Sequence, residues 1–283
     1  MVRMVVSDMD GTLLNRYGQI SPGNLDAIRS LEERGIEFVI ASGRDYSGVY
    51  PILDEHRLTC EAILGNGSQY VDRAGKILMS CYMDKAVVKD VAGIFKSRNI
   101  PYMIFATDGF YTEYVPSFVR DMFIERGRRR SGGNGEEFEK GGKKEYMPCN
   151  RLQKIDDFDR FLSGDLEIIK VEAFAMESHE LEEARESLKN IPGISFLSSL
   201  EDNVEVTDKE AQKGYILEKV IRMKGLSKEE VMVIGDGMND LSLFQCFPNS
   251  FAPSNACEKI KELAGTVVGS NEEDGFAQAV SKI

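Results

Sequence analysis

The sequence predicts an α/β protein: one domain built on a parallel sheet, with a second, α+β domain inserted in it. Short β-branched runs alternate with helical segments at both ends of the chain, which is typical of βαβ units. The middle of the chain lacks this alternation and contains hairpin signals instead. The predicted boundaries are 1–83 for the first part of the parallel-sheet domain, 84–207 for the inserted domain and 208–283 for the second part.

The composition limits the classes of function. A chain of 283 residues with 42% hydrophobic residues suits two modest domains, and a net charge of −12 argues against nucleic acid as a partner. Five scattered cysteines without a C-x-x-C pair and two histidines indicate neither a disulfide framework nor a zinc site. No apolar run approaches the ~20 residues that span a bilayer. With no signal peptide before the first strand, we expect a cytoplasmic protein that does not associate with membranes.

The first third of the chain carries the clearest element signals. Residues 1–7 form a short β-branched run that predicts a buried strand. A helix is expected over 22–33, because Ser21 can cap it, Pro22 lies in its first turn and Gly35 follows its end. The elements expected next are a strand at 36–41, a helix at 45–53, a strand at 62–64, a break at 65–67, and a hairpin of 69–71 with 76–80.

The inserted segment has a different pattern. The elements expected there are a helix at 85–98, a hairpin of 102–105 with 110–114, a strand at 166–176, a helix at 180–190 and a strand at 194–197. Residues 126–144 contain six glycines and ten charged residues, so a flexible loop is expected. Its positive excess could draw in an anionic substrate, but a solvated insertion is the preferred interpretation.

The alternation of strand and helix returns near the C-terminus. The elements expected there are a helix at 213–223, a strand at 231–234, a short strand at 250–252, and helices at 256–263 and 274–280. No internal repeat is found. The simplest architecture is therefore a parallel sheet that the inserted segment interrupts.

Two carboxylates, Asp8 and Asp10, follow the first strand at a spacing of two residues. If the strand continues through them, its alternation points both the same way, with Met9 opposite. One acid could then attack a phosphoryl group while the other handles the proton of the leaving group. Taken alone, two acids at the end of a strand are more often a turn or a solvated edge.

Polar residues also follow other strands of the predicted sheet. Because the carboxyl ends of parallel strands meet at one edge of the sheet, we expect these residues to gather there. Oxygen ligands without histidine suit Mg²⁺, and a bound Mg²⁺ would offset enough charge for a carboxylate to attack phosphorus. The residues concerned are Ser42, Gly43 and Arg44 after the second strand, Asn66 after the third, Lys213 before the late strand, and Asp236, Asn239 and Asp240 after it.

Four of these segments resemble the four motifs of the haloacid dehalogenase superfamily. The segments are Asp8-Met9-Asp10-Gly11-Thr12, Ala41-Ser42-Gly43-Arg44, Gln212-Lys213-Gly214 and Gly235-Asp236-Gly237-Met238-Asn239-Asp240. The large insertion after the third strand is similar to that of the superfamily's Cof-type phosphatases. The resemblance covers nearly the whole chain and implies a Rossmann-like core, a mobile cap and Mg²⁺-dependent hydrolysis of a phosphate ester.

The resemblance also implies roles for the catalytic residues. Asp8 would be the nucleophile and a Mg²⁺ ligand. Asp10 would protonate the leaving oxygen and then activate water, and its backbone carbonyl would bind the metal. Ser42 would hydrogen-bond a phosphoryl oxygen, and Lys213 would offset negative charge on the phosphate and on Asp8.

The remaining roles concern the metal and the substrate. By resemblance, Asp236 would hold the metal directly, Asp240 directly or through water, and Asn239 would orient the phosphate or Asp8. Substrate contact is expected from the loop of Gly43 and Arg44 and from Asn66, as well as from Lys213 and Asn239. For Arg44 and Asn66, helix capping or turn geometry is an equally open interpretation.

The leading hypothesis is a phosphatase of a small phosphorylated metabolite, such as a sugar phosphate or a phosphoglycolate-like compound, acting through an aspartyl-phosphate. A phosphomutase of the same superfamily is the alternative. A receiver-like signalling domain also uses an acid cluster and a lysine, but it needs neither an inserted domain nor a second acid after the nucleophile. The sequence leaves the substrate and the oligomeric state open.

Overall fold

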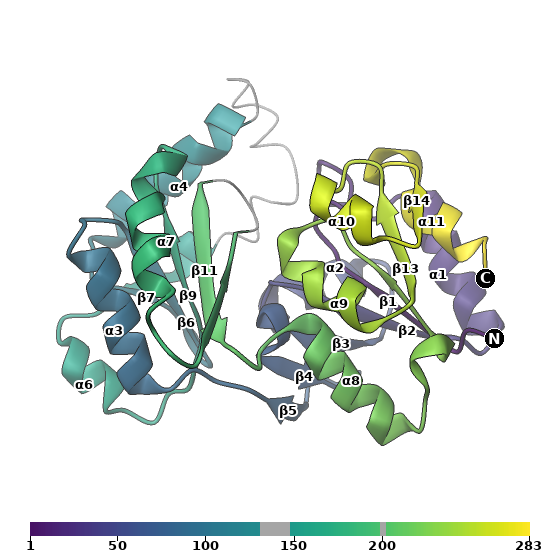
Figure 1. Ribbon diagram of the computed structural model, residues 1–283, viewed down its shortest axis with the longest axis horizontal. Helices are drawn as coiled ribbons and strands as arrows, with labels where there is room; N and C mark the ends of the chain where they lie inside the picture. Colours follow the sequence, from purple (N-terminus) through teal and green to yellow (C-terminus); the bar gives the residue numbers. More distant parts are fainter. Residues whose placement is uncertain (131–147, 199–201) are drawn as a thin grey trace. The chain divides into compact units, whose positions relative to one another are not determined.

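The computed structural model describes residues 1–130, 148–198 and 202–283. They divide into two compact units (Figure 1). The core unit comprises Met1–Ser80 and Ala211–Ile283, and the inserted unit comprises Cys81–Glu210. The predicted fold class, a parallel-sheet core with an inserted α+β domain, is confirmed.

The core unit contains an eight-stranded sheet in the order β14-β13-β12-β1-β2-β3-β4-β5. The strands from β14 to β3 run parallel, and β4 and β5 are antiparallel additions at one edge. The central strand β1 is buried throughout, as its apolar sequence predicts. The strands are β1 Met4–Ser7, β2 Glu37–Ala41, β3 Glu61–Leu64, β4 Gln69–Val71, β5 Ile77–Ser80, β12 Val231–Ile234, β13 Asn249–Pro253 and β14 Thr266–Val268.

Helices cover the core sheet. The helix α1 spans Pro22–Glu33, as predicted, and the side chain of Ser21 caps it by accepting from the backbone N–H of Asn24. Apolar residues of α1, α2 and α11 share one buried cluster with the sheet, while α8 lies against β3 and α9. The other helical segments are α2 Tyr46–Glu55, η1 Gly65–Gly67, α8 Lys213–Lys224, η5 Lys228–Glu230, η6 Met238–Asp240, α9 Leu241–Cys246, α10 Glu258–Leu263, η7 Asn271–Glu273 and α11 Gly275–Val280.

The inserted unit contains a six-stranded sheet in the order β10-β11-β9-β6-β7-β8, antiparallel except for the pair β7 and β8. Along β6, Tyr102 and Ile104 pack with α3, α6 and α7, while Met103 and Phe105 pack with α4. The elements are α3 Lys85–Lys96, β6 Tyr102–Ala106, β7 Gly109–Thr112, α4 Pro116–Arg130, η3 Pro148–Arg151, β8 Leu152–Lys154, α6 Phe158–Leu162, β9 Ile168–Phe174, η4 Ser178–Leu181, α7 Glu182–Leu188, β10 Ile194–Leu197 and β11 Asn203–Asp208. None of the helices in the described ranges has the length and hydropathy that crossing a bilayer requires.

The prediction of a flexible loop over 126–144 is wrong for its first residues, because α4 continues through Arg130. Arg126 is 2% exposed and forms paired hydrogen bonds with the carboxylate of Asp202, at 2.9 and 2.6 Å. Its guanidinium also lies over the ring of Phe174, 4.8 Å from the centroid. The charge of Arg126, one of the ten that suggested a solvated loop, is therefore paired inside the unit. The rest of the predicted loop, 131–144, lies outside the described residues.

Candidate active site

The polar residues predicted at the strand ends gather at the carboxyl edge of the core sheet. The parallel register places Ser7, the last residue of β1, beside Ile234 of β12 and Ile40 of β2, so the three strands end at the same level. The backbone N–H of Asp8 extends this pairing by donating to the carbonyl of Ile234, at 2.9 Å. Asp8 is consequently fixed at the end of β1 and is only 4% exposed.

Lys213 connects two carboxylates of this edge. Its Nζ lies 2.6 Å from Asp8 Oδ1 and 2.6 Å from Asp240 Oδ1, and its side chain is completely buried. Lys213 is the first residue of α8, and Gly214 follows it in the first turn of the helix. A Cβ atom on Gly214 would lie 2.2 Å from the carbonyl oxygen of Ser242, so glycine is required for this close approach.

Asp240 organises the loop after β12. Its Oδ2 accepts from the backbone N–H groups of Asp236 and Gly237, at 3.0 and 3.1 Å, while its Oδ1 accepts from Lys213. Thr12, for which no role was predicted, donates its hydroxyl to Asp236 Oδ1 at 2.9 Å and is fully buried. Its place in the first motif was the only sequence signal for this role, since nothing local links it to a residue 224 positions away.

Asp8, Asp236 and Asp240 form a triad in which one carboxylate oxygen from each residue lies within 4.8 Å of the other two. Burial raises the pKa of Asp8 well above its usual range, although the charge of Lys213 lowers it. The charges of Asp240 and Asp236 raise it further. Burial also raises the pKa of Asp236 to about 7, with a contribution from Asp240. Of these three carboxylates, Lys213 contacts two, those of Asp8 and Asp240. An all-oxygen set with excess negative charge suits a hard divalent cation.

Asp10 lies outside this triad. The prediction that strand alternation aligns it with Asp8 is wrong in its premise, because β1 ends at Ser7. The Asp10 side chain is 46% exposed, and Arg44 binds both of its oxygens: Nε donates to Oδ2 and Nη2 to Oδ1, each at 2.7 Å. The structure thus pairs Arg44 with a carboxylate of the site, a contact that the sequence did not predict.

The loops after β2 and β3 meet beside the triad. Ser42 Oγ accepts from the backbone N–H of Arg44 at 3.1 Å, and Asn66 Oδ1 accepts from Asn239 Nδ2 at 3.2 Å. Asn66 adopts a left-handed backbone with φ 59°. A Cβ atom on Gly43 would lie 2.8 Å from Asn66 Oδ1, so the missing side chain of Gly43 makes room for this amide. The predicted residues of all four motifs and Asn66 therefore belong to one connected set of loops.

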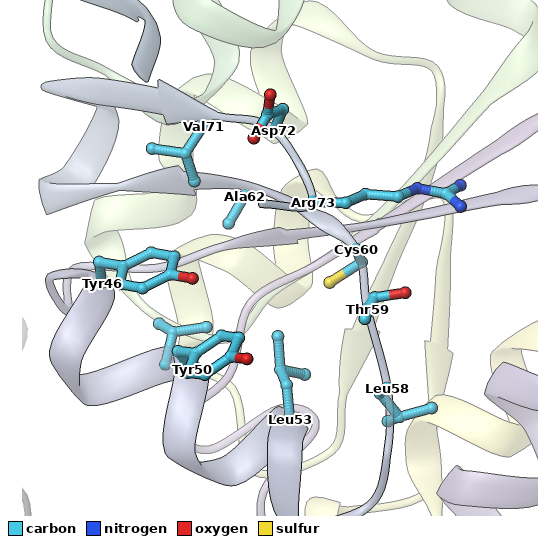
Figure 2. A pocket seen from close by; sticks show the side chains of 11 residues that line it. Tyr46, Tyr50, Leu53, Leu58, Thr59, Cys60, Ala62, Val71, Asp72 and Arg73 are labelled. Atoms are coloured by element: carbon cyan, nitrogen blue, oxygen red, sulfur yellow. The ribbon is translucent and has the colours of Figure 1, made fainter. Parts of the chain in front are cut away.

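A separate pocket lies beside α2 (Figure 2). The rings of Tyr46 and Tyr50 stack there with centroids 5.2 Å apart, and Asp72 and Arg73 lie on another of its sides. Cys60 also lines it, and burial raises the pKa of this thiol to about 12, which disfavours the thiolate form that a nucleophile needs. No residue of the triad is among the residues that line this pocket.

Comparisons with known proteins agree with this geometry. Residues 5–280 match the model of a family described as haloacid dehalogenase-like hydrolase. Phosphatase YwpJ of Bacillus subtilis is 25% identical over 284 residues, with 100% of both chains covered. The 5-amino-6-(5-phospho-D-ribitylamino)uracil phosphatase YwtE of the same organism is 26% identical, with 100% of this chain and 98% of that protein covered. A solved haloacid dehalogenase-like hydrolase from B. subtilis superposes with a TM-score of 0.89 at 25% identity, with 100% of both chains covered.

Proposed function

Because the chain belongs to the haloacid dehalogenase-like hydrolase family and is a phosphoric monoester hydrolase, we propose that it hydrolyses a small phosphorylated metabolite through a phosphorylated Asp8, with Mg²⁺ as cofactor. The bridge from Lys213 to Asp8 and Asp240 carries this proposal. A buried ammonium beside a carboxylate at the carboxyl edge of the sheet is what a nucleophile needs when it must approach a negatively charged phosphoryl group.

Asp8, Asp236 and Asp240 would hold the metal, together with the backbone carbonyl of Asp10 that the family resemblance adds. When bound, Mg²⁺ would supply positive charge that offsets the phosphoryl oxygens and the excess carboxylates. The raised pKa values of Asp8 and Asp236 support this assignment, because they reflect burial and a repulsion that a cation would relieve.

The proposed reaction has two displacements. In the first, Asp8 Oδ2 attacks phosphorus, the bond from phosphorus to the ester oxygen breaks, and Asp10 gives a proton to the leaving oxygen. In the second, Asp10 takes a proton from water, the oxygen of that water attacks phosphorus, and the bond to Asp8 breaks to release phosphate. Ser42 and Lys213 would bind the phosphoryl oxygens, and Asn239 would orient them.

The names of the relatives support the substrate class. They are phosphatases of 5-amino-6-(5-phospho-D-ribitylamino)uracil, of pyridoxal phosphate and of HMP-PP, which are all small phosphorylated metabolites. Since these substrates differ at comparable identity, we propose the class and, within it, a sugar phosphate or a phosphoglycolate-like compound. A phosphomutase remains the second candidate, because it would use the same nucleophile and pass the phosphoryl group to another hydroxyl.

The proposal is tested by phosphate release from a panel of sugar phosphates, phosphoglycolate and pyridoxal phosphate. We expect release with Mg²⁺, loss of release in EDTA, recovery on renewed addition of Mg²⁺, and poor substitution by Zn²⁺, since no thiolate or histidine lies in the triad. Full turnover in EDTA would contradict the metal assignment. An isomerised sugar phosphate without free phosphate would favour the mutase.

A further inference from the structure

Arg44 makes a clamp on an exposed carboxylate. Its Nε and Nη2 donate to the two oxygens of Asp10 at 2.7 Å each, and its Nη1 donates to the carbonyl of Gly48 at 3.0 Å. The side chain of Arg44 is 8% exposed, whereas that of Asp10 is 46% exposed. A rigid, buried guanidinium therefore fixes a side chain that would otherwise sample several rotamers.

The backbone of Arg44 and the carbonyl that its guanidinium contacts are both held in place. The backbone N–H of Arg44 donates to Ser42 Oγ at 3.1 Å, and its carbonyl accepts from Gly65 N at 3.0 Å. Gly48 lies in the first turn of α2, which Asp45 caps by accepting from the N–H of Gly48 at 3.1 Å. Arg44 thus ties Asp10 to the loop after β3 and to the start of α2.

Asp10 lies beyond the end of β1, in a turn where it forms an isolated bridge with Leu14. The next residue, Gly11, has a backbone φ of 81°, which residues with a side chain rarely adopt. Proton transfer to a leaving oxygen requires the acid within hydrogen-bond reach, and a displacement of about 1 Å can cost on the order of 100-fold in rate. The paired contact with Arg44 fixes the orientation of the Asp10 carboxylate plane.

We propose that Arg44 is a positioning residue for Asp10 and acts through it, and is not the substrate ligand that the sequence suggested. All three of its guanidinium nitrogens donate to protein oxygens, which commits the group to Asp10 and Gly48. The inference rests on the proposed function of Asp10 in proton transfer. The two roles of Arg44 have different kinetic effects. Loss of a positioning residue lowers kcat, and this effect disappears once Asp10 can no longer transfer a proton.

The experiment is a double-mutant cycle with Arg44→Gln, Asp10→Asn and the double variant, each saturated with Mg²⁺. Alkyl and aryl phosphate monoesters are compared, because an alkoxide needs a proton more than an aryl oxide does. In single-turnover phosphorylation of Asp8, we expect Arg44→Gln to lower the rate with the alkyl ester on the order of 10- to 100-fold, and less with the aryl ester, while the steady-state KM stays within about 3-fold. In the Asp10→Asn background the same substitution should cost less than about 3-fold.

Two further variants separate positioning from folding. Arg44→Lys keeps the charge but not the paired hydrogen bonds of the guanidinium, so it should restore only part of kcat. If Arg44→Gln fails to fold, Arg44→Lys replaces it in the double-mutant cycle. Arg126→Gln is the matched control, since Arg126 is also a buried arginine and pairs with Asp202 in the inserted unit. It should lower thermal stability, and any effect on kcat should not depend on the leaving group and should add to that of Asp10→Asn.

The outcomes distinguish this inference from the function on which it rests. Two results would overturn the positioning role alone, provided that the wild type releases phosphate. One is a double variant whose loss equals the product of the two single losses, and the other is an Arg44→Gln loss confined to KM. An Asp10→Asn loss in single-turnover phosphorylation that is equal for alkyl and aryl esters would overturn the proposed role of Asp10 as the acid, and this inference with it. A wild type that releases no phosphate from any ester would overturn the proposed function itself.

Discussion

Lys213 Nζ lies 2.6 Å from Asp8 Oδ1, and both side chains are buried at the carboxyl edge of the core sheet. Burial alone would lower the pKa of Lys213, but the carboxylates of Asp240 and Asp8 more than offset this and raise it, so the lysine stays charged. The pair therefore places a permanent positive charge beside the proposed nucleophile.

Replacing this charge should stop catalysis. Lys213→Met keeps the length of the side chain but leaves Asp8 and Asp240 without their shared cation, so kcat with saturating Mg²⁺ should fall on the order of 100- to 1,000-fold. Lys224→Met is the matched control, because Lys224 lies on the same helix and pairs with Glu37 and Glu61. Its kcat should stay within about 3-fold of wild type. A Lys213 variant with more than about a tenth of wild-type kcat would contradict the role of the lysine.

The metal-free protein should lose stability as pH rises, through Asp236. Burial raises the pKa of this carboxyl from 3.8 to about 7, so the folded state binds its proton more tightly than the unfolded state. Its contribution to stability is therefore present below about pH 4 and is lost as pH rises to about 7.

Asp236→Asn isolates this effect, since the amide does not titrate. In EDTA, wild type and variant should melt at similar temperatures near pH 4, and the variant should melt higher at about pH 8, by on the order of a few degrees. Mg²⁺ should raise the melting temperature of the wild type more than that of the variant. A difference between the two proteins that does not change with pH would contradict the raised pKa.

Asn66 offers separate tests of its amide and its backbone. Asn66→Gly removes the acceptor for Asn239 but tolerates φ 59°, whereas Asn66→Ala removes the acceptor and strains the backbone. Both should lower kcat/KM to a similar extent, about 10-fold, and only alanine should cost a further ~1 kcal/mol of stability. Wild-type kcat/KM in the glycine variant would show that the amide is dispensable.

Arg126 should be a structural residue and not part of an entrance for anionic substrates. Arg126→Met leaves Asp202 without its buried partner and should cost about 3 kcal/mol of unfolding free energy in denaturant titrations. The control Arg129→Met, at an arginine that is 53% exposed, should change it by less than about 0.5 kcal/mol. A loss of kcat/KM for Arg126→Met that shrinks with added salt would instead indicate substrate steering.

Local sequence signals predicted the elements that carry the site. The helix α1 begins and ends where Ser21, Pro22 and Gly35 indicated, because capping is a local interaction. The strand β11 was missed although Val204 and Val206 alternate with polar residues, a signal that was present. The helix α4 was missed because its stability depends on distant contacts, such as those of Val119 and Arg126, which a run of charges does not reveal.

The sequence predicted which residues gather at the carboxyl edge of the core sheet better than it predicted which of them are in contact. The ends of the parallel strands β1 and β12 place Asp8 and Asp236 at one edge, and the start of α8 brings Lys213 to Asp8 there. The partner of Asp10 could not be predicted, because Arg44 lies 34 residues away and its direction depends on how the loops after β2 and β3 pack. For the same reason Thr12 was passed over, since its hydroxyl finds Asp236 only in the folded chain.

Chemical capture of the phosphorylated nucleophile tests the role of Asp8 most directly. An Asp10→Asn variant with Mg²⁺ and an aryl phosphate should phosphorylate normally but hydrolyse the intermediate slowly, since no base activates water. After an acid quench, borohydride reduction and proteolysis, mass spectrometry should find homoserine in place of Asp8, and none in Asp8→Asn. Unmodified Asp8 in every quenched sample that releases phosphate, or an adduct on another residue, would contradict Asp8 as the nucleophile.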